Sequence, residues 1–304
     1  MVRRLIINAD GFGFGGGATR GIFDALASGG PITSVSVNAN FPDARRTSEL
    51  VVGYPAVSIG VHLNAVVGEP LLGRKSVPTL VGEDGTFPGP RFKRLWRKGK
   101  IDPRELEAEF DAQIGLVKAI AGPRLTHLDS HQNSHLLYFD LFIRLAMKWS
   151  IPCIRTNASL ICLEAPLPAR ARRRVYLRRP AVWLVHAYRR FQMRRAAAAG
   201  LRMADRLVTI GYAGLGNKAC RETWISVFQN LPQGTFEIYC HPAHPDEVLA
   251  KWASYVQPRA EELRILSDPA LRSAASKSGV ELIGFADLLD GGGRSTAGVR
   301  REVT

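Results

Sequence analysis

Aspartate and histidine side chains recur at the ends of short runs of β-forming residues in this 304-residue sequence. Both residue types can exchange protons and bind metal ions. Each polar residue taken alone could simply belong to a turn, but their recurrence at equivalent positions predicts that they meet in one site. The residues at these run ends are Asp10, His62, Asp129 with His131, Arg155 with Asn157, and His241.

The runs that would position these side chains number eight, and helical signals lie between them. Asp102-Pro103 is a typical helix start, and a second Asp-Pro pair at 268–269 repeats it. Strands that alternate with helices predict an α/β fold with a parallel sheet, and eight strands favour a TIM-like (β/α) barrel, closed or incomplete. The carboxyl ends of its strands would then share one face. The runs are 5–10, 32–40, 57–64, 125–131, 153–157, 207–212, 235–241 and 280–285.

The positive charge of the chain is concentrated in one segment. Of a formal net charge of +14, most comes from residues 170–206, which contain twelve arginines and one acidic residue. We therefore predict a single domain over 1–290 with an Arg-rich helical insertion at about 165–206, and a flexible tail over 291–304. Arginines mixed with Trp183, Tyr188 and Phe191 suit an anionic lipid surface or a groove for a phosphorylated substrate, although a solvated helix face is the alternative.

Several classes of function find no support in the sequence. The four cysteines lack zinc-ligand spacing, and no apolar stretch is long enough for a signal peptide or a membrane span. The basic segment contains no nucleic-acid reader motif, so we expect no nucleic acid partner. The glycine-rich residues 11–17 match no nucleotide-binding fingerprint and favour a tight turn. We expect a cytoplasmic protein, peripheral at most at the inner membrane face, with its oligomeric state open.

Four segments together resemble the YdjC/ChbG/HpnK family of carbohydrate N-deacetylases. In sequence letters they are LIINADGFG from residue 5, IGVHLN from residue 59, THLDSHQNSH from residue 126 and EIYCHP from residue 237. Their order and spacing fit the family over nearly the whole chain. The resemblance implies a barrel-like fold and hydrolysis of the N-acetyl group of an amino sugar with a divalent metal, zinc or magnesium.

The resemblance also implies roles for individual residues. Asp10 matches the general base, His62 and His131 match metal ligands, and His241 is a candidate acid or oxyanion partner. Zinc usually has three protein ligands in catalytic sites, and Asp129, Asp10 or His135 could supply the third. We further predict substrate contacts from Asn8, Asn64, His135, Arg155 and His244.

The chain departs from the family pattern at Gly11, where the family carries a second, metal-binding aspartate. Residues 132–134, Gln-Asn-Ser, also stand where family members often carry more histidine. The alternative function is therefore a non-catalytic carbohydrate-binding relative with a degraded metal site. The string AHPDE over 243–247 resembles a motif of LmbE/PIG-L-type zinc deacetylases, but it lies near the wrong end of the chain.

Overall fold

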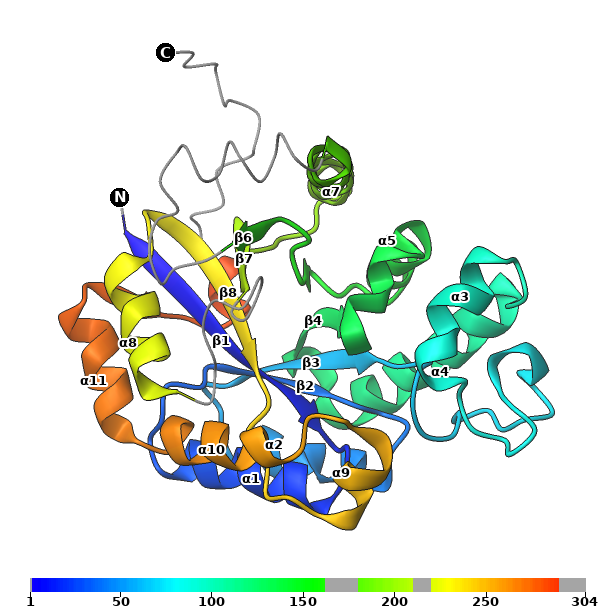
Figure 1. The fold of residues 1–304 in the computed structure, drawn as a ribbon, viewed down its shortest axis with the longest axis horizontal. Coiled ribbons are helices and arrows are strands. Elements are labelled where there is room, and N and C mark those ends of the chain that lie inside the picture. Colours follow the sequence, from blue (N-terminus) through cyan, green and yellow to red (C-terminus); the bar gives the residue numbers. More distant parts are fainter. Residues whose placement is uncertain (1, 162–179, 210–219, 290–304) are drawn as a thin grey trace.

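The computed structural model describes residues 2–161, 180–209 and 220–289 of the chain. Its centre is a parallel sheet of nine strands in the order β5-β4-β3-β2-β1-β8-β7-β6, with β9 paired to β1 (Figure 1). The strands are β1 (Arg3–Phe12), β2 (Ser34–Val37), β3 (Ser58–Leu63), β4 (Leu125–Ser130), β5 (Cys153–Ile154), β6 (Ser159–Ile161), β7 (Arg206–Thr209), β8 (Gly234–Cys240) and β9 (Val280–Leu282).

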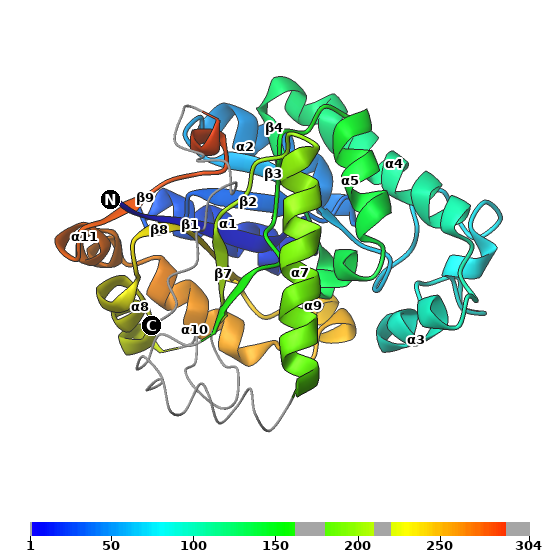
Figure 2. The same ribbon diagram turned by 90° about the horizontal axis from the view of Figure 1, so that it is seen from above.

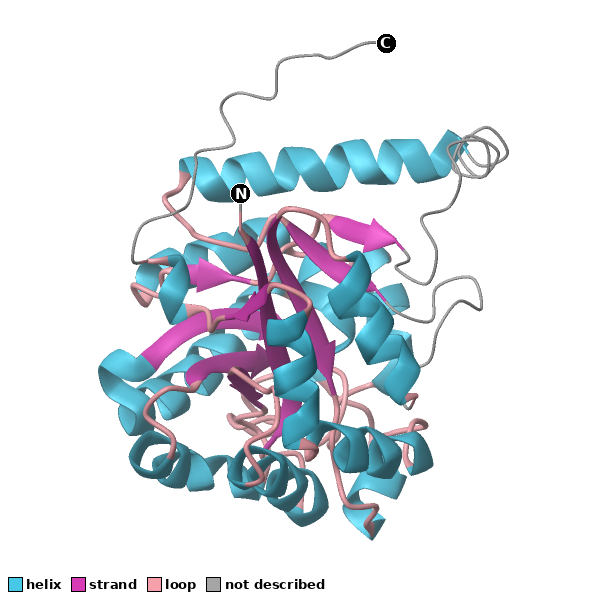
Figure 3. Ribbon diagram, turned by 90° about the vertical axis from the view of Figure 1, so that its left-hand side faces the viewer, coloured by secondary structure: helices cyan, strands magenta, loops and turns pink. Residues whose placement is uncertain are grey.

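The α-helices form a layer around this sheet, and α7 lies along the outside at one end (Figures 2 and 3). None of the described helices combines the length and the apolar character needed to cross a bilayer. The helices are α1 (Gly16–Ala27), α2 (Thr47–Gly53), α3 (Phe92–Arg97), α4 (Pro103–Ala121), α5 (Phe139–Lys148), α7 (Pro180–Ala198), α8 (Arg221–Asn230), α9 (Glu247–Trp252), α10 (Gln257–Leu266) and α11 (Pro269–Lys277).

Strand β1 is the centre of the sheet. Leu5, Ile6 and Ile7 are fully buried, as expected for a parallel strand that is covered on both faces. One edge of β1 pairs with β8, while β9 and then β2 share the other edge. The pairing with β2 shifts register between Asp10 and Phe12, and Gly11 between them has a φ of 110° that favours glycine. This irregularity turns the strand end directly after Asp10.

Both predicted helix starts are confirmed by side-chain caps. The Asp102 carboxylate accepts a hydrogen bond from the Arg104 amide at 2.8 Å, and Asp268 accepts one from the Ala270 amide at 2.8 Å. In α4 the residues at helical spacing from Leu106 to Val117 bury one apolar face. These helices therefore begin where local sequence chemistry places them.

The predicted barrel-like α/β architecture is confirmed in its incomplete form. The sheet has β5 at one end of its strand order and β6 at the other, and no pairing between these two strands is seen among the described residues. The Cys153 position of β5 forms only an isolated bridge, with Arg202. All eight predicted runs contain a strand, although residues 210–212 of one lie outside the described residues. The sequence prediction missed β6, a three-residue strand that follows β5 closely.

The predicted insertion is described only in part. Helix α7 falls within it, whereas residues 162–179 and the proposed tail 291–304 lie outside the described residues. The proposed domain bounds therefore stay predictions.

Candidate active site

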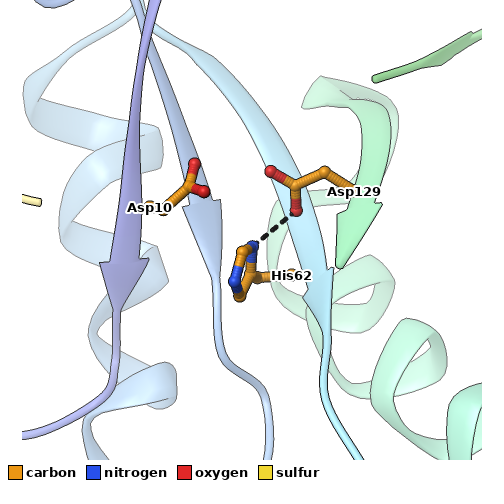
Figure 4. A group of neighbouring side chains, drawn as sticks. All are labelled: Asp10, His62 and Asp129. Atoms are coloured by element: carbon orange, nitrogen blue, oxygen red, sulfur yellow. Dashed lines mark hydrogen bonds and ion pairs between the residues drawn. The ribbon is translucent and has the colours of Figure 1, made fainter. Parts of the chain in front are cut away.

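Three buried side chains meet at the carboxyl ends of neighbouring strands. Asp10 lies on β1, His62 on β3 and Asp129 on β4, and one potential ligand atom from each lies within 4.8 Å of the others. Figure 4 shows the three side chains pointing toward one another across β2. Parallel strands bring their carboxyl ends to the same face, so residues 119 positions apart in the chain form one group.

Arg155, which follows β5, binds the carboxylates in the protein interior. Its Nη1 and Nη2 donate to the two oxygens of Asp10 at 2.8 and 2.7 Å. Its Nη2 also lies 2.8 Å from Asp129 Oδ2, and its Nε donates to Glu237 at 2.6 Å. One guanidinium therefore joins carboxylates from three strands. Because Arg155 is only 1% exposed, these ion pairs are shielded from water.

The guanidinium decides which of these carboxylates are ionised. Burial alone would raise the pKa of Asp10, but the charge and hydrogen bonds of Arg155 outweigh it and hold that pKa well below its usual range. Arg155 and His62 likewise lower the pKa of Asp129 against the effect of burial. For Glu237 burial prevails and raises the pKa to about 7. Asp10 and Asp129 are therefore anionic at neutral pH, whereas Glu237 readily holds a proton.

Two neutral polar residues complete the network between the strands. The Asn8 amide donates to Asp10 Oδ1 at 2.7 Å, and the Ser36 hydroxyl on β2 donates to Asp129 Oδ2 at 2.8 Å. Asn8 also donates to the Ser36 hydroxyl at 2.8 Å. The network fixes the position of both aspartates before any ligand binds.

His62 of this group and the neighbouring His131, which is not one of the three side chains within 4.8 Å of one another, are of a type that fits a divalent cation. His62 Nδ1 lies 2.8 Å from Asp129 Oδ1, which orients the ring and leaves Nε2 without a partner among the described residues. The His131 ring centroid lies 5.6 Å from that of His62. Burial, with the charges of His62 and Arg259, lowers the pKa of His131 to about 3, so its imidazole is neutral, as metal binding requires.

The backbone after His131 turns sharply. Gln132 and Asn133 adopt left-handed φ values of 53° and 51°. The turn brings His135 back under β4, where its ring nitrogens lie 2.6 Å from the Ser130 hydroxyl and 2.6 Å from Asn157 Oδ1. Both nitrogens of His135 are therefore engaged within the protein.

The remaining predicted residues lie at different distances from the aspartates. His241 is half-buried at the end of β8, with its amide bonded to Glu262 and its ring edge-on to Tyr239 and Tyr255. Its charge contributes to the low pKa of Asp10, so it borders the group. His244 instead pairs with Asp24 of α1 at 2.6 Å.

Asn64 is buried in the turn after β3, where it serves the backbone. Its amide group donates to the Val67 carbonyl at 2.8 Å, and its side-chain oxygen accepts from the amides of Val66 and Val67. These contacts hold the turn that follows His62.

Sequence reasoning missed three residues of this region: Ser36, Glu237 and Arg259. Ser36 and Glu237 lie inside their strands, and a carboxylate in an otherwise apolar strand was the available signal for Glu237. Arg259 lies on α10, and its terminal nitrogen Nη1 is 3.6 Å from the point where a Cβ on Gly11 would stand. No local pattern in the sequence connects these two positions.

Comparison with known proteins gives the relationships of the chain. The family model described as "YdjC-like protein" matches residues 4–277. The chain belongs to the YdjC-like family. It is 31% identical to a carbohydrate deacetylase of Geobacillus stearothermophilus, over 95% of this chain and 99% of that protein. It is 28% identical to a chitooligosaccharide deacetylase of Yersinia pestis, over 94% of this chain and 100% of that protein.

A solved structure supports the same assignment. The crystal structure of a putative cellobiose-phosphate cleavage protein from Enterococcus faecalis is similar with a TM-score of 0.74 and 27% identity. The match covers 95% of this YdjC-like chain and 99% of that one. The predicted family and its barrel-like fold are therefore confirmed.

The Arg155 network generates a first prediction. Arg155→Met leaves three buried carboxylates without their cation, so we expect the free energy of unfolding to fall by about 3–5 kcal/mol at neutral pH. Without Arg155, burial raises the pKa values of Asp10 and Asp129 above those of the unfolded chain. The free energy of unfolding of the variant then rises as the pH falls from neutral toward about 5. The difference in this free energy between wild type and variant becomes smaller.

Urea unfolding of both proteins at the two pH values measures this deficit. The control is Arg144→Met, which removes an exposed cation paired with Glu107 and should change stability by less than about 1 kcal/mol. Arg155→Lys should give an intermediate loss if the methionine variant does not fold. A deficit that is the same at both pH values would contradict the electrostatic account.

Proposed function

We propose that this chain hydrolyses the N-acetyl group of an N-acetylated amino sugar with the assistance of a divalent metal ion. The observation that carries the proposal is the buried group of Asp10, His62 and Asp129 at the strand ends. It occurs in a chain that aligns along 95% of its length with a carbohydrate deacetylase. Amide hydrolysis needs a base, an acid and a means of polarising the carbonyl, and this group offers residue types for each.

The ion would be held by His62, His131 and one of the carboxylates Asp10 and Asp129, and zinc and magnesium are the candidates. A divalent ion in such a site polarises the amide carbonyl and lowers the pKa of a water molecule. Whether or not Asp129 binds the ion, its contact with Nδ1 sets the orientation of the His62 ring.

Asp10 would act as the general base. Arg155 keeps it ionised, so it can always accept a proton, but its low pKa also makes it a weak base. It therefore takes a proton efficiently only from a water molecule that is itself acidified. His241 borders the same space from β8 and would donate a proton to the departing amine.

Gly11 favours a second candidate function, a carbohydrate-binding protein without catalysis. Glycine offers no ligand atom at the end of β1, and the cation of Arg259 lies near that position. A weakened metal site would follow from this arrangement. Metal content separates the two functions, because the enzyme requires a bound ion and the binding protein does not.

The role of Asp10 is tested with Asp10→Asn. The change keeps the shape of the side chain but removes the base, so we expect release of free amine from N-acetylglucosamine oligomers to fall at least ~100-fold. Circular dichroism should show a folded protein, because Arg155 stays paired with Asp129 and keeps its contact with Glu237. The control Asp111→Asn alters an ion pair with Lys148 on the outer helices. A rate within about threefold of wild type would remove Asp10 from the mechanism.

The metal site is tested by replacing its imidazoles. His62→Ala and His131→Ala should each lower bound zinc or magnesium at least ~10-fold in elemental analysis of the purified protein, and turnover should fall in parallel. His244→Ala should change the metal content little, because that ring pairs with Asp24. Wild-type protein that binds no divalent ion after exposure to either metal would favour the carbohydrate-binding function.

We also propose that α7 holds the protein against an anionic membrane surface and that the sugar is part of a lipid- or phosphate-linked glycan. Four large apolar residues of α7 are exposed: Leu184, Val185, Tyr188 and Phe191. The cations Arg190 and Arg194 are exposed on the same helix. Exposed apolar side chains together with cations are typical of helices that lie in the interface of a bilayer.

The inner face of α7 contacts the segment that carries Arg155. The Asn157 side chain donates to Gln192 at 3.3 Å, and the Asn157 amide donates to the Met193 sulfur at 3.1 Å. A surface bound by the outer face of α7 would therefore lie on the side of the protein that supports the site. This proximity supports a substrate whose carrier resides in the membrane.

Liposome co-sedimentation tests the membrane proposal. Each arginine near an anionic surface contributes about 1 kcal/mol, so Arg190→Glu with Arg194→Glu should weaken binding to anionic vesicles at least ~10-fold. Activity on a short soluble sugar should be unchanged. The control, Arg104→Glu with Lys277→Glu, reverses two exposed charges outside α7. Equal binding of wild type to neutral and anionic vesicles, at low and high salt, would contradict the proposal.

A further inference from the structure

Arg259 is a buried cation whose terminal nitrogens are unused. The residue lies on α10 and is only 7% exposed. Its Nε donates to the Tyr255 carbonyl at 2.7 Å, whereas Nη1 and Nη2 have no acceptor among the described residues. Neither terminal nitrogen is among the described polar atoms that are both fully buried and without a partner, so both keep some contact with solvent. A guanidinium with solvent-accessible donors beside a buried group can exchange its water for an anionic ligand.

The guanidinium borders the proposed site. Nη1 is 3.6 Å from the point where a Cβ on Gly11 would stand, and Gly11 directly follows the proposed base Asp10. The Arg259 Cζ lies 6.0 Å from the centroid of the Phe14 ring, which in turn stacks against His131 at 6.1 Å. The charge of Arg259 acts on both Asp10 and His131. Arg259 thus faces the ends of β1 and β4 from the side of α10.

Glycine at position 11 keeps the guanidinium accessible. A side chain at this position would project toward Nη1, and an acidic one would pair with it. Glu262 of the same helix, whose charge acts on Arg259, is instead engaged by the His241 amide at 2.7 Å and the Tyr255 hydroxyl at 2.7 Å. No described carboxylate lies within ion-pair distance of Arg259, in contrast to Arg155.

We propose that Arg259 is the anion-binding group of this site and that it binds a carboxylate, the acetate released from the sugar. The identity of the anion rests on the proposed deacetylase function. In that reaction a C–O bond forms from water and the C–N bond breaks. The nitrogen takes both protons of the water and leaves as an ammonium group, and acetate leaves with one negative charge. A guanidinium matches the two oxygens of a carboxylate with parallel hydrogen bonds. The position beside Asp10 favours acetate over an anionic group elsewhere on the sugar, because the acetyl carbon must lie near the base.

Isothermal titration of the metal-free full-length protein with sodium acetate tests the proposal without requiring turnover. Wild type should bind acetate, Arg259→Gln should bind it at least ~10-fold more weakly, and Arg259→Lys should be intermediate. The control Arg264→Gln removes an exposed cation of the same helix that pairs with Glu261, and it should bind acetate as wild type does. Thermal melting confirms that each variant is folded.

Gly11→Asp provides an independent variant. The new carboxylate should pair with Arg259 and suppress acetate binding. Because residue 11 has a φ of 110°, the substitution strains the backbone, so thermal melting must show that the variant is folded before its acetate binding is compared. Acetate binding that is the same in wild type, Arg259→Gln and Gly11→Asp would overturn the proposal. Inorganic phosphate that binds through Arg259 when acetate does not would overturn the assignment to acetate.

Enzyme assays separate this proposal from the proposed function. If no amine is released from any acetylated sugar but acetate binding depends on Arg259, the deacetylase function fails and the anion site remains. If amine is released and acetate inhibits wild type and Arg259→Gln equally, the anion site fails and the deacetylase function remains.

Discussion

The site depends on the ion pairs between Arg155 and the carboxylates of Asp10, Asp129 and Glu237. Three buried acidic groups on β1, β4 and β8 would repel one another and would take up protons if no cation lay between them. Arg155 removes this repulsion, and its planar donors fix the two aspartates at defined positions. Burial raises the pKa of Glu237 to about 7, because Arg155 offsets only part of the cost of burying that carboxylate.

The sequence predicted the parts of this arrangement that follow from local chemistry. Asp102 and Asp268 cap their helices as the Asp-Pro pairs indicated. Asp10, His62 and Asp129 stand at or near the ends of β-forming runs, and the structure brings them together. Asp10, His62 and Asp129 could be grouped because parallel strands place all their carboxyl ends on one face. This rule for parallel strands applies whatever the strand order. It therefore predicts that the three side chains lie near one another, but it does not predict which of them contact each other.

The parts that could not be predicted depend on strand order and on packing between distant segments. Glu237 reaches Arg155 because β8 lies beside β1, although more than 200 residues separate these strands in the chain. Ser36 joins the network because β2 runs between β1 and β3. Arg155 was predicted as a substrate contact, but all its nitrogens face carboxylates of the protein. A strand-end pattern identifies such a residue without indicating whether its partner is a ligand or the protein itself.

Two buried arginines lie near Asp10, and they differ in how many carboxylates they contact. This number distinguishes an arginine that stabilises the protein from one that is available to bind a ligand. Arg155 contacts three carboxylates, and removing any one of them would leave it paired. Arg259 contacts a backbone carbonyl and an aromatic ring but no carboxylate among the described residues. Burial lowers the pKa of Arg259 because the charge lacks compensation, whereas the carboxylates raise the pKa of Arg155 against the same effect. An incoming anion gains little from a cation that is already neutralised, so a negatively charged group entering this face would be drawn to Arg259 and away from Arg155.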